Sequence, residues 1–389
     1  MIQKWFVSLK VIITIIFIIY YMKIKGFELE RYFAKHEFKS KYLLSSSDCD
    51  GYSLKYILDC ADREELRLWN DLKFGYTDSA GSLFLRESIA VQYKNISPDN
   101  IIVLSPGEAN FILMNIFLEA GDEIVCMYPA YQSLYQIAAD MGCKVKFWKP
   151  DEKMKYNIEV LEDLVNEKTK LLIVNFPHNP TGFIPTQPEL MKIIDISNKY
   201  NVLLFSDEIY HQLVHNERDV ISSISDMCSN SVSLGGMSKS FGLAGLRIGW
   251  LVTKRPDLIR KILTFKDYLT ICNNAAGEVL SYIALNHKEK FITPNIKKII
   301  RNKDIFKKFV MNNNEFLNFS DTKAGSVALV RLKTDITSLE YCENIVRETG
   351  IMLVPSEMFN FGNTHIRIGF GREDFEEALN VWQKYIYLH

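Results

Sequence analysis

Two residues of this sequence have types and surroundings that suit chemistry on an aldehyde. Lys239 lies in the segment Gly235-Gly236-Met237-Ser238-Lys239-Ser240, where small residues surround its amine, and such an amine can form a covalent imine. Asp207 follows the largely apolar run 202–206, and a carboxylate there can keep the nitrogen of a pyridine ring protonated. Pyridoxal phosphate (PLP) needs both groups, because its aldehyde takes a lysine and its protonated ring becomes an electron sink. We therefore expect PLP as the cofactor, with Lys239 as the catalytic residue.

The ring of PLP offers two further surfaces, and suitable side chains follow other apolar runs. Asn179, in Phe176-Pro177-His178-Asn179-Pro180-Thr181-Gly182, and Tyr210 can donate hydrogen bonds to the ring oxygen. Tyr131 can pack on the face of the ring. Each residue also has an ordinary alternative, as a turn residue before proline or as a core aromatic residue. Their places after successive strand-like runs favour the cofactor.

The phosphate of PLP calls for backbone amides at a helix start, hydroxyl groups and an arginine. The turn 105–109 opens an apolar helical stretch, and since Pro106 has no N–H, the amides would come from Gly107 and Glu108. Ser238 and Arg247 complete the predicted set. The carboxylate of Glu108 is unusual beside a phosphate, because like charges repel. It either points away or faces a cationic group of the substrate.

The segments that position these residues alternate between strand-like and helix-like patterns, which indicates an α/β protein. Several strand candidates are continuous apolar runs, as expected for strands that are buried on both faces. Ligands of open α/β sheets bind beyond the carboxyl ends of the strands, where the residues above are found. The expected strands are 101–104, 123–127, 171–175, 202–206, 231–234 and 248–253.

Changes in composition and in the strand-like and helix-like patterns along the chain predict four regions. Residues 1–22 form an apolar N-terminal segment, 23–72 an arm with part of a small domain, 73–265 a large cofactor-binding domain and 266–389 the small domain. In the last region we expect strands at 327–332, 351–354 and 365–370, with a helix at 338–348.

The chain resembles the class I and II aminotransferases, a family of PLP enzymes of fold type I. The resemblance covers roughly residues 40 to 385, as a judgement from motif order. Motifs in the order of the family carry it: FPHNPTG (176–182), SDEIYHQL (206–213), SKSFGLAGLRIGW (238–250) and HIRIGFG (365–371). The resemblance implies a large domain with a mostly parallel seven-stranded sheet and a smaller α/β C-terminal domain, as is usual for this fold.

Further roles follow only from this resemblance. Arg367 matches the arginine that binds the substrate α-carboxylate, with Asn179 beside it. Tyr76 matches a tyrosine that reaches the cofactor phosphate of the neighbouring subunit, which implies a homodimer. Residues 43–48 match the stretch that covers the substrate. The sequence departs from the family at Gly236, where a phosphate-binding serine is common.

The resemblance implies an aminotransferase that moves an amino group from an amino acid to a 2-oxo acid by a ping-pong mechanism. One alternative keeps the cofactor but changes the outcome, as a lyase, a cyclase or an arginine-modifying enzyme, because fold does not fix reaction type. A second alternative is a non-catalytic PLP-binding regulator. No basic helix-turn-helix pattern precedes the family region, which disfavours the regulator.

Composition bears on three properties of the protein: its partners, its location and metal binding. The formal net charge is −1, so nothing global favours nucleic acid as a partner. The seven cysteines form no CxxC pair, which favours a reducing, cytoplasmic location. His178, His211 and His215 lack the spacing of metal ligands, and we expect no metal.

The apolar run 11–21 is the one feature that could link the chain to a membrane, through residues 5–22. It is short for a membrane span, and no small-x-small cleavage site follows it. Three interpretations are open: a membrane anchor, a buried helix, or an upstream extension before a true start at Met22.

Overall fold

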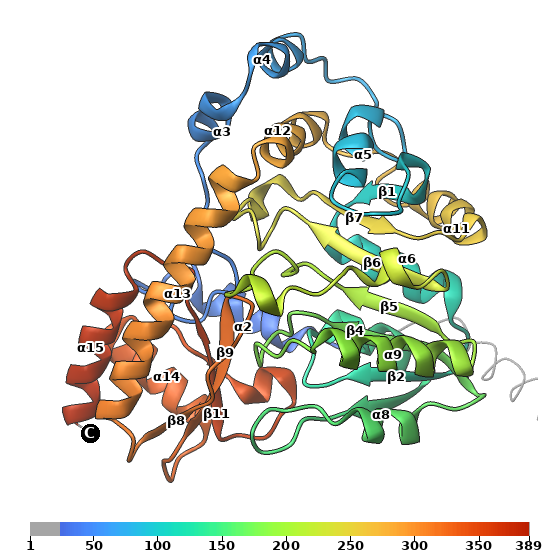
Figure 1. The fold of residues 1–389 in the computed structure, drawn as a ribbon. Coiled ribbons are helices and arrows are strands. Elements are labelled where there is room, and N and C mark those ends of the chain that lie inside the picture. Colours follow the sequence, from blue (N-terminus) through green and yellow to red (C-terminus); the bar gives the residue numbers. More distant parts are fainter. Residues whose placement is uncertain (1–23, 389) are drawn as a thin grey trace, which may run out of the picture.

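The computed structural model describes residues 24–388, which form a large sheet and a smaller sheet, each flanked by helices (Figure 1). The apolar segment 1–22 and its three interpretations lie outside the described residues. Within residues 24–388, no helix combines the length and the hydropathy that crossing a membrane requires.

The large sheet has seven strands in the order β1-β7-β6-β5-β4-β2-β3. All neighbouring pairs are parallel except those of β7, which runs antiparallel to β1 and β6. The predicted mostly parallel seven-stranded sheet is therefore confirmed. The strands are β1 Ile101–Leu104, β2 Glu123–Met127, β3 Lys144–Trp148, β4 Thr169–Asn175, β5 Leu203–Asp207, β6 Ser231–Gly236 and β7 Gly249–Val252.

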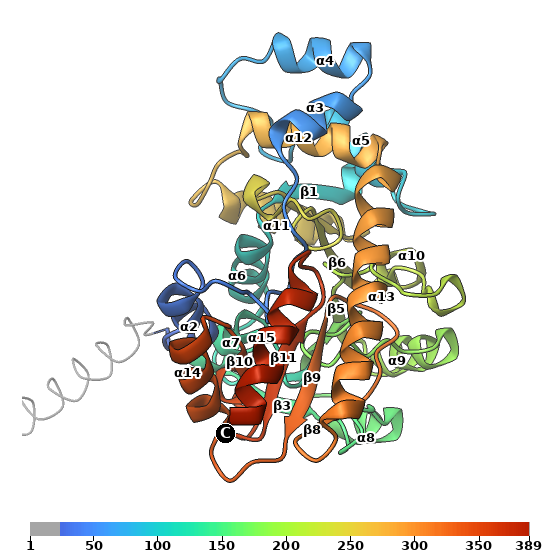
Figure 2. The same cartoon turned by 90° about the vertical axis from the view of Figure 1, so that its left-hand side faces the viewer.

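Helices cover both faces of this sheet, which explains why its central strands are buried on both faces. Successive strand residues point to opposite faces, so Ile102 and Leu104 pack in one core while Ile101 and Val103 pack in another. Figure 2 shows α6 and α9 on opposite sides of the sheet. One face carries α6 Pro106–Phe117, α7 Gln136–Asp140 and α11 Pro256–Lys266; the other carries α5 Leu83–Ala90, α8 Ile158–Leu164, α9 Gln187–Lys199, α10 Ile224–Met227 and α12 Ala275–Asn286.

The smaller sheet is antiparallel, in the order β10-β11-β9-β8, and it confirms the smaller C-terminal α/β part. Its strands are β8 Leu317–Phe319, β9 Val327–Leu332, β10 Val354–Pro355 and β11 His365–Gly369. The accompanying helices are α13 Glu289–Asn312, α14 Ser338–Thr349 and α15 Phe375–Leu388. Short 3₁₀ helices span η1 Pro98–Asn100, η2 Gln132–Leu134, η3 Glu217–Asp219, η4 Ala244–Leu246 and η5 Ser356–Phe359.

Residues 24–72 lie in two places, although we expected 23–72 to fold beside the small domain. Helix α2 (Glu28–His36) contacts η5, and Tyr42 forms a bridge with Ile351, so this part does lie beside the smaller sheet. Helices α3 (Leu54–Cys60) and α4 (Arg63–Asn70) instead pack against α12, at the far end of the large sheet (Figure 1). The predicted domain boundaries stay a prediction.

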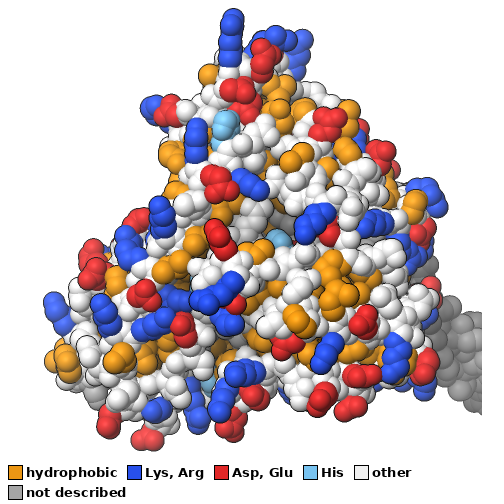
Figure 3. Space-filling view, viewed as in Figure 1, with side chains coloured by type: hydrophobic (Ala, Val, Ile, Leu, Met, Phe, Trp, Pro, Cys, Tyr) orange, Lys and Arg blue, Asp and Glu red, His pale blue; other side chains and the backbone are white. Residues whose placement is uncertain are grey.

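The surface carries charges of both signs in mixture. Lys and Arg side chains gather along α13 on the face drawn in Figure 3, with acidic side chains among them. Several of these cations are paired, as in Lys298 with Asp50, Arg301 with Glu373 and Lys307 with Asp321.

Candidate active site

A cavity of about 200 Å³ lies at the carboxyl ends of β4, β5 and β6. The structure brings nine of the predicted site residues to its walls: Gly107, Tyr131, Asn179, Asp207, Tyr210, Ser238, Lys239, Arg247 and Arg367. A larger cavity of about 310 Å³ lies behind Gly235 and Gly236, but its walls hold none of the predicted site residues. We therefore place the candidate site in the smaller cavity.

Asp207 is the last residue of β5 and is almost completely buried at the floor of this cavity. One carboxylate oxygen accepts a hydrogen bond from the backbone N–H of Ile209 at 3.1 Å. Burial raises the pKa of Asp207 to about 7; the nearby charge of Glu208 acts in the same direction, and Lys239 opposes it. A cation placed against this carboxylate would restore its ionised form.

Lys239 follows β6 and is half-buried. Its Nζ donates a hydrogen bond to Oγ of Ser47 at 2.9 Å. Within residues 24–388, no carboxylate lies within ion-pair distance of this amine, so it is not held in a structural salt bridge. An amine without a counter-ion inside a cavity is available for covalent chemistry.

Arg367 reaches the same cavity from β11 of the smaller sheet, with 1% of its surface exposed. Its Nε and Nη2 donate to the carbonyl oxygen of Ser45 at 3.1 and 2.8 Å, and Nη1 donates to Oδ1 of Asn179 at 3.2 Å. Burial lowers the pKa of Arg367, and no carboxylate of the described chain pairs with it. A buried guanidinium without a counter-ion is suited to an anionic ligand.

Asn179 is held in turn by Asn175, whose Oδ1 accepts from the backbone N–H of Asn179 at 2.7 Å. The amide Nδ2 of Asn175 donates to the carbonyl of Asp207 at 2.8 Å. The ends of β4 and β5 are thus tied together directly below the cavity.

One corner of the cavity is suited to a phosphate. Gly107 lies in the first turn of α6, and a Cβ atom built there would meet nothing within 4 Å, so the corner is open. Arg247 faces the cavity from a left-handed backbone conformation (φ 57°), which is uncommon outside glycine. Together with the buried Ser238, these groups supply a helix N-terminus, a hydroxyl and a cation.

Two tyrosines line the middle of the cavity. Tyr210 is buried, and Tyr131 packs its ring against Phe27 with centroids 4.8 Å apart. The hydroxyl of Tyr131 donates to Oε1 of Glu30 at 2.6 Å. Burial raises the pKa of Tyr131, and the charge of Glu30 adds to the shift.

Tyr76 and Glu108 are the predicted site residues that lie outside the walls of the cavity. Tyr76 is 88% exposed on the surface of the chain. The carboxylate of Glu108 accepts from Oγ1 of Thr270 at 2.6 Å and closes a capping box with Ser105 at the start of α6. Of the two alternatives for this carboxylate, the structure shows the one in which it points away from the cavity.

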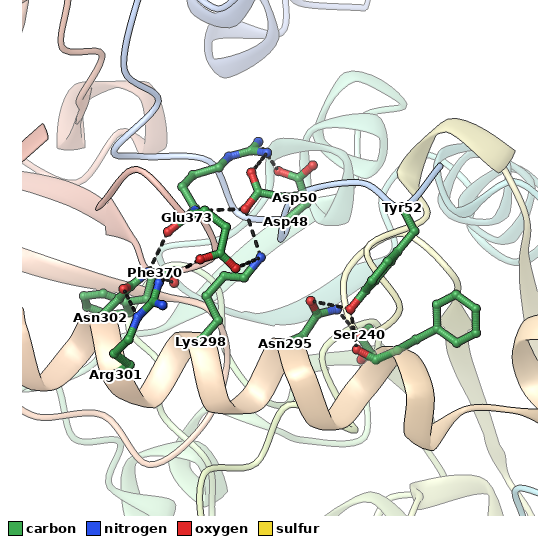
Figure 4. A network of polar contacts seen from close by, with 12 residues as sticks. Asp48, Asp50, Tyr52, Ser240, Asn295, Lys298, Arg301, Asn302, Phe370 and Glu373 are labelled. Carbon is green, nitrogen blue, oxygen red and sulfur yellow. Dashed lines mark hydrogen bonds and ion pairs between the residues drawn. The ribbon is translucent and has the colours of Figure 1, made fainter. Parts of the chain in front are cut away.

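A polar network fixes the segment that carries Ser45 and Ser47 (Figure 4). Lys298 of α13 pairs with Asp50 at 2.9 Å and with Glu373 at 3.0 Å, and Arg372 bonds to Asp48 and Asp50. The network anchors the segment 45–50 to α13 and to the chain after β11.

The same helix touches the lysine segment directly. Nδ2 of Asn295 on α13 donates to the carbonyl of Ser240 at 3.1 Å, next to Lys239 (Figure 4). Helix α13 therefore contacts both the segment that carries Ser47 and the segment that carries Lys239.

Gly236 is explained by local packing. A Cβ atom at this position would lie 2.6 Å from Cδ1 of Ile209 and 3.2 Å from Cα of Gly249. The serine that is common in the family would require the side chain of Ile209 to move and the backbone at Gly249 to shift slightly.

Several residues of the cavity were not among those predicted from the sequence. Ser47, Asn175, Asn110, Glu30 and Phe33 all line it. Ser47 had a signal, because residues 43–48 match the substrate-covering stretch. Helix α2 gave no sequence signal for its place at the cavity. Its amphipathic spacing predicts a helix but does not indicate which surface the helix covers.

The residues present fit PLP. A buried carboxyl, an unpaired amine and an anion-binding corner surround one cavity, and these are the groups required by the ring nitrogen, the aldehyde and the phosphate. His178 is buried and burial lowers its pKa to about 3. Over residues 24–388, no group of three His, Cys, Asp or Glu side chains is arranged to hold a metal ion.

Comparison with known proteins gives one family. The model of the family described as aminotransferase class I and II matches residues 39–381. The chain is 27% identical to capreomycidine synthase from Streptomyces vinaceus, over 90% of this chain and 91% of that protein. It is 24% identical to an aspartate aminotransferase from Sulfolobus acidocaldarius, over 77% of this chain and 78% of that protein.

Solved structures share the fold. A PLP-dependent aminotransferase from Streptococcus suis superposes with a TM-score of 0.88 at 22% identity, covering 94% of this chain and 98% of that one. The PLP-dependent cyclase OrfR superposes with a TM-score of 0.87 at 24% identity, with the same coverage.

Proposed function

The chain belongs to the class I and II aminotransferase family and is a PLP-dependent aminotransferase, and on this premise we propose that it moves the amino group of an amino acid to a 2-oxo acid by a ping-pong mechanism. One observation carries the proposal. Arg367 is buried without a counter-ion in the walls of the cavity that also holds Asp207 and Lys239. A guanidinium in that position suits the α-carboxylate that all amino acids and 2-oxo acids share.

We propose that Lys239 holds the cofactor covalently and that Asp207 faces its ring nitrogen. Asn179 and Tyr210 would donate to the ring oxygen, and Tyr131 would pack on the ring. Asp207 supports this assignment, because the burial that raises its pKa is offset when a protonated nitrogen lies against it.

The phosphate would lie in the corner formed by Gly107, Ser238 and Arg247. The backbone N–H of Glu108 belongs to the same helix start and is the remaining amide, but it already faces Oγ of Ser105 at 3.4 Å. Its carboxylate takes no part, because Thr270 holds it away.

When bound, PLP acts as an electron sink that eases loss of the α-proton of an amino acid. Lys239 Nζ, once released by the substrate, would remove that proton and return it as a general base and acid. Ser47 would hold the released amine in place, since its Oγ already lies 2.9 Å from Nζ. Arg367 would orient the substrate, and α2 would exclude water from above.

We also propose a homodimer in which Tyr76 reaches the phosphate in the site of the other subunit. Tyr76 is exposed beside Phe74, and the neighbouring segment 266–273, linked to residues 77–79 by hydrogen bonds, exposes Tyr268 and Ile271. Exposed aromatic and aliphatic side chains that gather from two segments are typical of a protein interface.

A single-turnover experiment tests the proposed reaction. The purified holoenzyme is mixed with one amino acid and no acceptor. We expect one 2-oxo acid to be released per site while the visible absorbance of the enzyme falls, and added 2-oxo acid should restore it. Failure of every amino acid to yield a 2-oxo acid would contradict transamination.

A second candidate reaction deserves the same experiment. The similarity to capreomycidine synthase and to the cyclase OrfR supports a PLP-dependent cyclase on this fold. A cyclase or an arginine-modifying enzyme would convert the amino acid into a product that keeps its α-amino group, and no 2-oxo acid would appear. An eliminating lyase would release a 2-oxo acid together with ammonia over many turnovers, and the visible absorbance of the enzyme would recover without an added 2-oxo acid.

We further propose a cytoplasmic location. All seven cysteines are unpaired, although Cys143 and Cys272 are partly exposed, which suits a reducing compartment. Fractionation of cells that express the full chain or a chain starting at Met22 tests this proposal; recovery of only the full chain with membranes would contradict it.

A further inference from the structure

The cavity holds a carboxylate that the proposed reaction does not use. Glu30 lies in the first turn of α2, is half-buried and lines the cavity. Its Oε1 accepts a hydrogen bond from the hydroxyl of Tyr131 at 2.6 Å. Among residues 24–388, no cationic side chain lies within ion-pair distance of Glu30. A partly buried anion without a counter-ion is costly unless a ligand supplies one.

The charges of the cavity leave Glu30 as the unmatched group. In the proposed function, the phosphate neutralises Arg247, the substrate carboxylate neutralises Arg367 and the ring nitrogen neutralises Asp207. Lys239 is used by the cofactor itself. Glu30 then remains as an anion that faces the bound substrate.

Glu30 lies close to the place of the substrate carboxylate but does not occupy it. Phe33, one turn further along α2, also lines the cavity, and its ring centroid lies 5.6 Å from Cζ of Arg367. Burial lowers the pKa of Arg367, and the charge of Glu30 is among those that oppose this shift. A substrate held at Arg367 would therefore have the carboxylate of Glu30 within reach of its side chain.

The surroundings of Glu30 reinforce its negative charge. Glu37, at the end of the same helix, is half-buried, and its pKa is raised by burial first and by Asp48 next, while Arg372 opposes the shift. Asp48 itself bonds to Arg372 at 3.2 Å. Glu37 has no ion pair among the described residues, so its carboxylate and that of Glu30 both disfavour an acidic side chain on this side of the cavity and favour a cationic one.

We propose that Glu30 selects amino acids whose side chain ends in a cation, a guanidinium or an ammonium group, while Arg367 holds their α-carboxylate. This inference rests on the proposed function, because it presupposes an amino acid bound at Arg367. Glu30 is then a specificity-determining residue on a helix that the rest of the reaction uses only as a cover.

A purely structural role for Glu30 would be to orient Tyr131. The substitution Glu30→Gln separates the two roles, because the amide oxygen of glutamine still accepts the tyrosine hydroxyl but carries no charge. Glu28→Gln is the matched control: Glu28 lies in the same first turn, is exposed and does not line the cavity.

The test compares pairs of amino acids of which one carries a cation at the end of its side chain and the other does not. L-arginine is paired with L-citrulline and L-lysine with L-norleucine, and the dissociation constant of each is taken from the change in the visible absorbance of the holoenzyme. In the wild-type protein, we expect the cationic member of each pair to bind more tightly than the neutral member, with a dissociation constant lower by about tenfold or more. The ratio should fall to about one in Glu30→Gln and stay unchanged in Glu28→Gln.

Equal binding of the two members of each pair in the wild-type protein would overturn the inference, and this comparison needs no variant. A loss in Glu30→Gln that is the same for both members would overturn it too, in favour of the structural role. If no amino acid changed the absorbance, the proposed function would fail. The melting temperature with arginine and with citrulline would then still decide the inference, because a cation-selective site is stabilised only by arginine.

Discussion

Asp207 and Arg367 are buried charged side chains that face one cavity from two different sheets. Neither has an ion-pair partner among the described residues. Burial raises the pKa of Asp207 and lowers the pKa of Arg367, so in both cases it favours the neutral form of the side chain. Buried charges without partners weaken a fold, and their presence in one cavity is explained if ligands of the opposite charge bind there. The side chains of the cavity therefore suit a ligand that brings a cationic group to Asp207 and an anionic group to Arg367.

The raised pKa of Asp207 makes the stability of the cofactor-free protein depend on pH. The folded pKa of about 7 exceeds the ordinary value of 3.8, so the folded state holds a proton that the unfolded state releases. This contribution is complete below the unfolded pKa and is lost as pH rises through the folded pKa. Between about pH 5 and about pH 8, we expect the wild-type protein to lose about 3 kcal/mol more unfolding free energy than Asp207→Asn.

Urea denaturation of the two cofactor-free proteins at both pH values measures this difference. The wild-type curve carries the contributions of all other groups, and Asp207→Asn carries the same contributions without the titration at 207. Parallel pH dependence of the two proteins would show that the carboxyl at 207 titrates at its ordinary value.

At the level of secondary-structure elements, the segment 44–50 links the two sides of the cavity. Its Ser45 carbonyl holds Arg367, its Ser47 hydroxyl accepts from Lys239, and Asp50 anchors it to α13 through Lys298. Burial raises the pKa of Asp50, but the hydrogen bond from Lys298 and nearby positive charges hold it below its ordinary value. The segment is thus held by these side chains as well as by backbone hydrogen bonds from the N–H of Gly369 in β11 to the carbonyl of Leu44 and from the N–H of Asp50 to the carbonyl of Gly371.

Asp50→Asn should loosen this segment without unfolding the protein. Asp50 is partly exposed, so we expect a cost of about 1 kcal/mol, which corresponds to about fivefold faster local hydrogen exchange at residues 44–49. The control is Asp59→Asn, which breaks only the exposed pair with Lys55. Hydrogen exchange with mass spectrometry gives the readout, and equal protection in both variants would count against the anchoring role.

The elements that the sequence predicts well are those with apolar runs buried on both faces. β1 and β2 have the predicted ends, and the other predicted strands of the large sheet are shifted by at most two residues. β3 is missing from the prediction because Lys144 and Lys146 interrupt its apolar pattern at the edge of the sheet. β8 is only three residues long and gives no periodic signal.

From the residues alone, the candidate site is most predictable at the ends of the parallel strands, whereas Arg367 is indicated by the family resemblance. Lys239 and Asn179 follow β6 and β4, Asp207 ends β5, and the parallel direction of these strands brings the three together. Glu30 lies far away in sequence, and nothing local indicates that α2 covers the cavity. Likewise, the close packing around Gly236 depends on the side chain of Ile209 and the backbone of β7, which are distant in sequence.

For the whole molecule, the proposed homodimer makes each site depend on two subunits. Tyr76 is 88% exposed and lies outside the walls of the cavity in its own chain, so a role at the phosphate requires a second copy. We expect Tyr76→Ala and Lys239→Ala to be weak or inactive separately. Mixed after unfolding and refolding, they should recover about a quarter of wild-type activity, since random pairing gives half hybrids with one intact site each.

Steady-state activity of the mixed sample measures this complementation, and wild-type protein mixed with Lys239→Ala and refolded in the same way is the control for refolding alone. Activity of the mixture no higher than the average of the two separate variants would contradict a site shared between subunits.

The most direct test of the account is to reduce the purified, PLP-loaded protein with borohydride and to locate the modified residue by peptide mass spectrometry. We predict a single PLP adduct on Lys239 and none on Lys239→Ala, whose visible absorbance should also be lost. A protein that stays colourless when PLP is added, or an adduct on a lysine outside the cavity, would contradict the central claim.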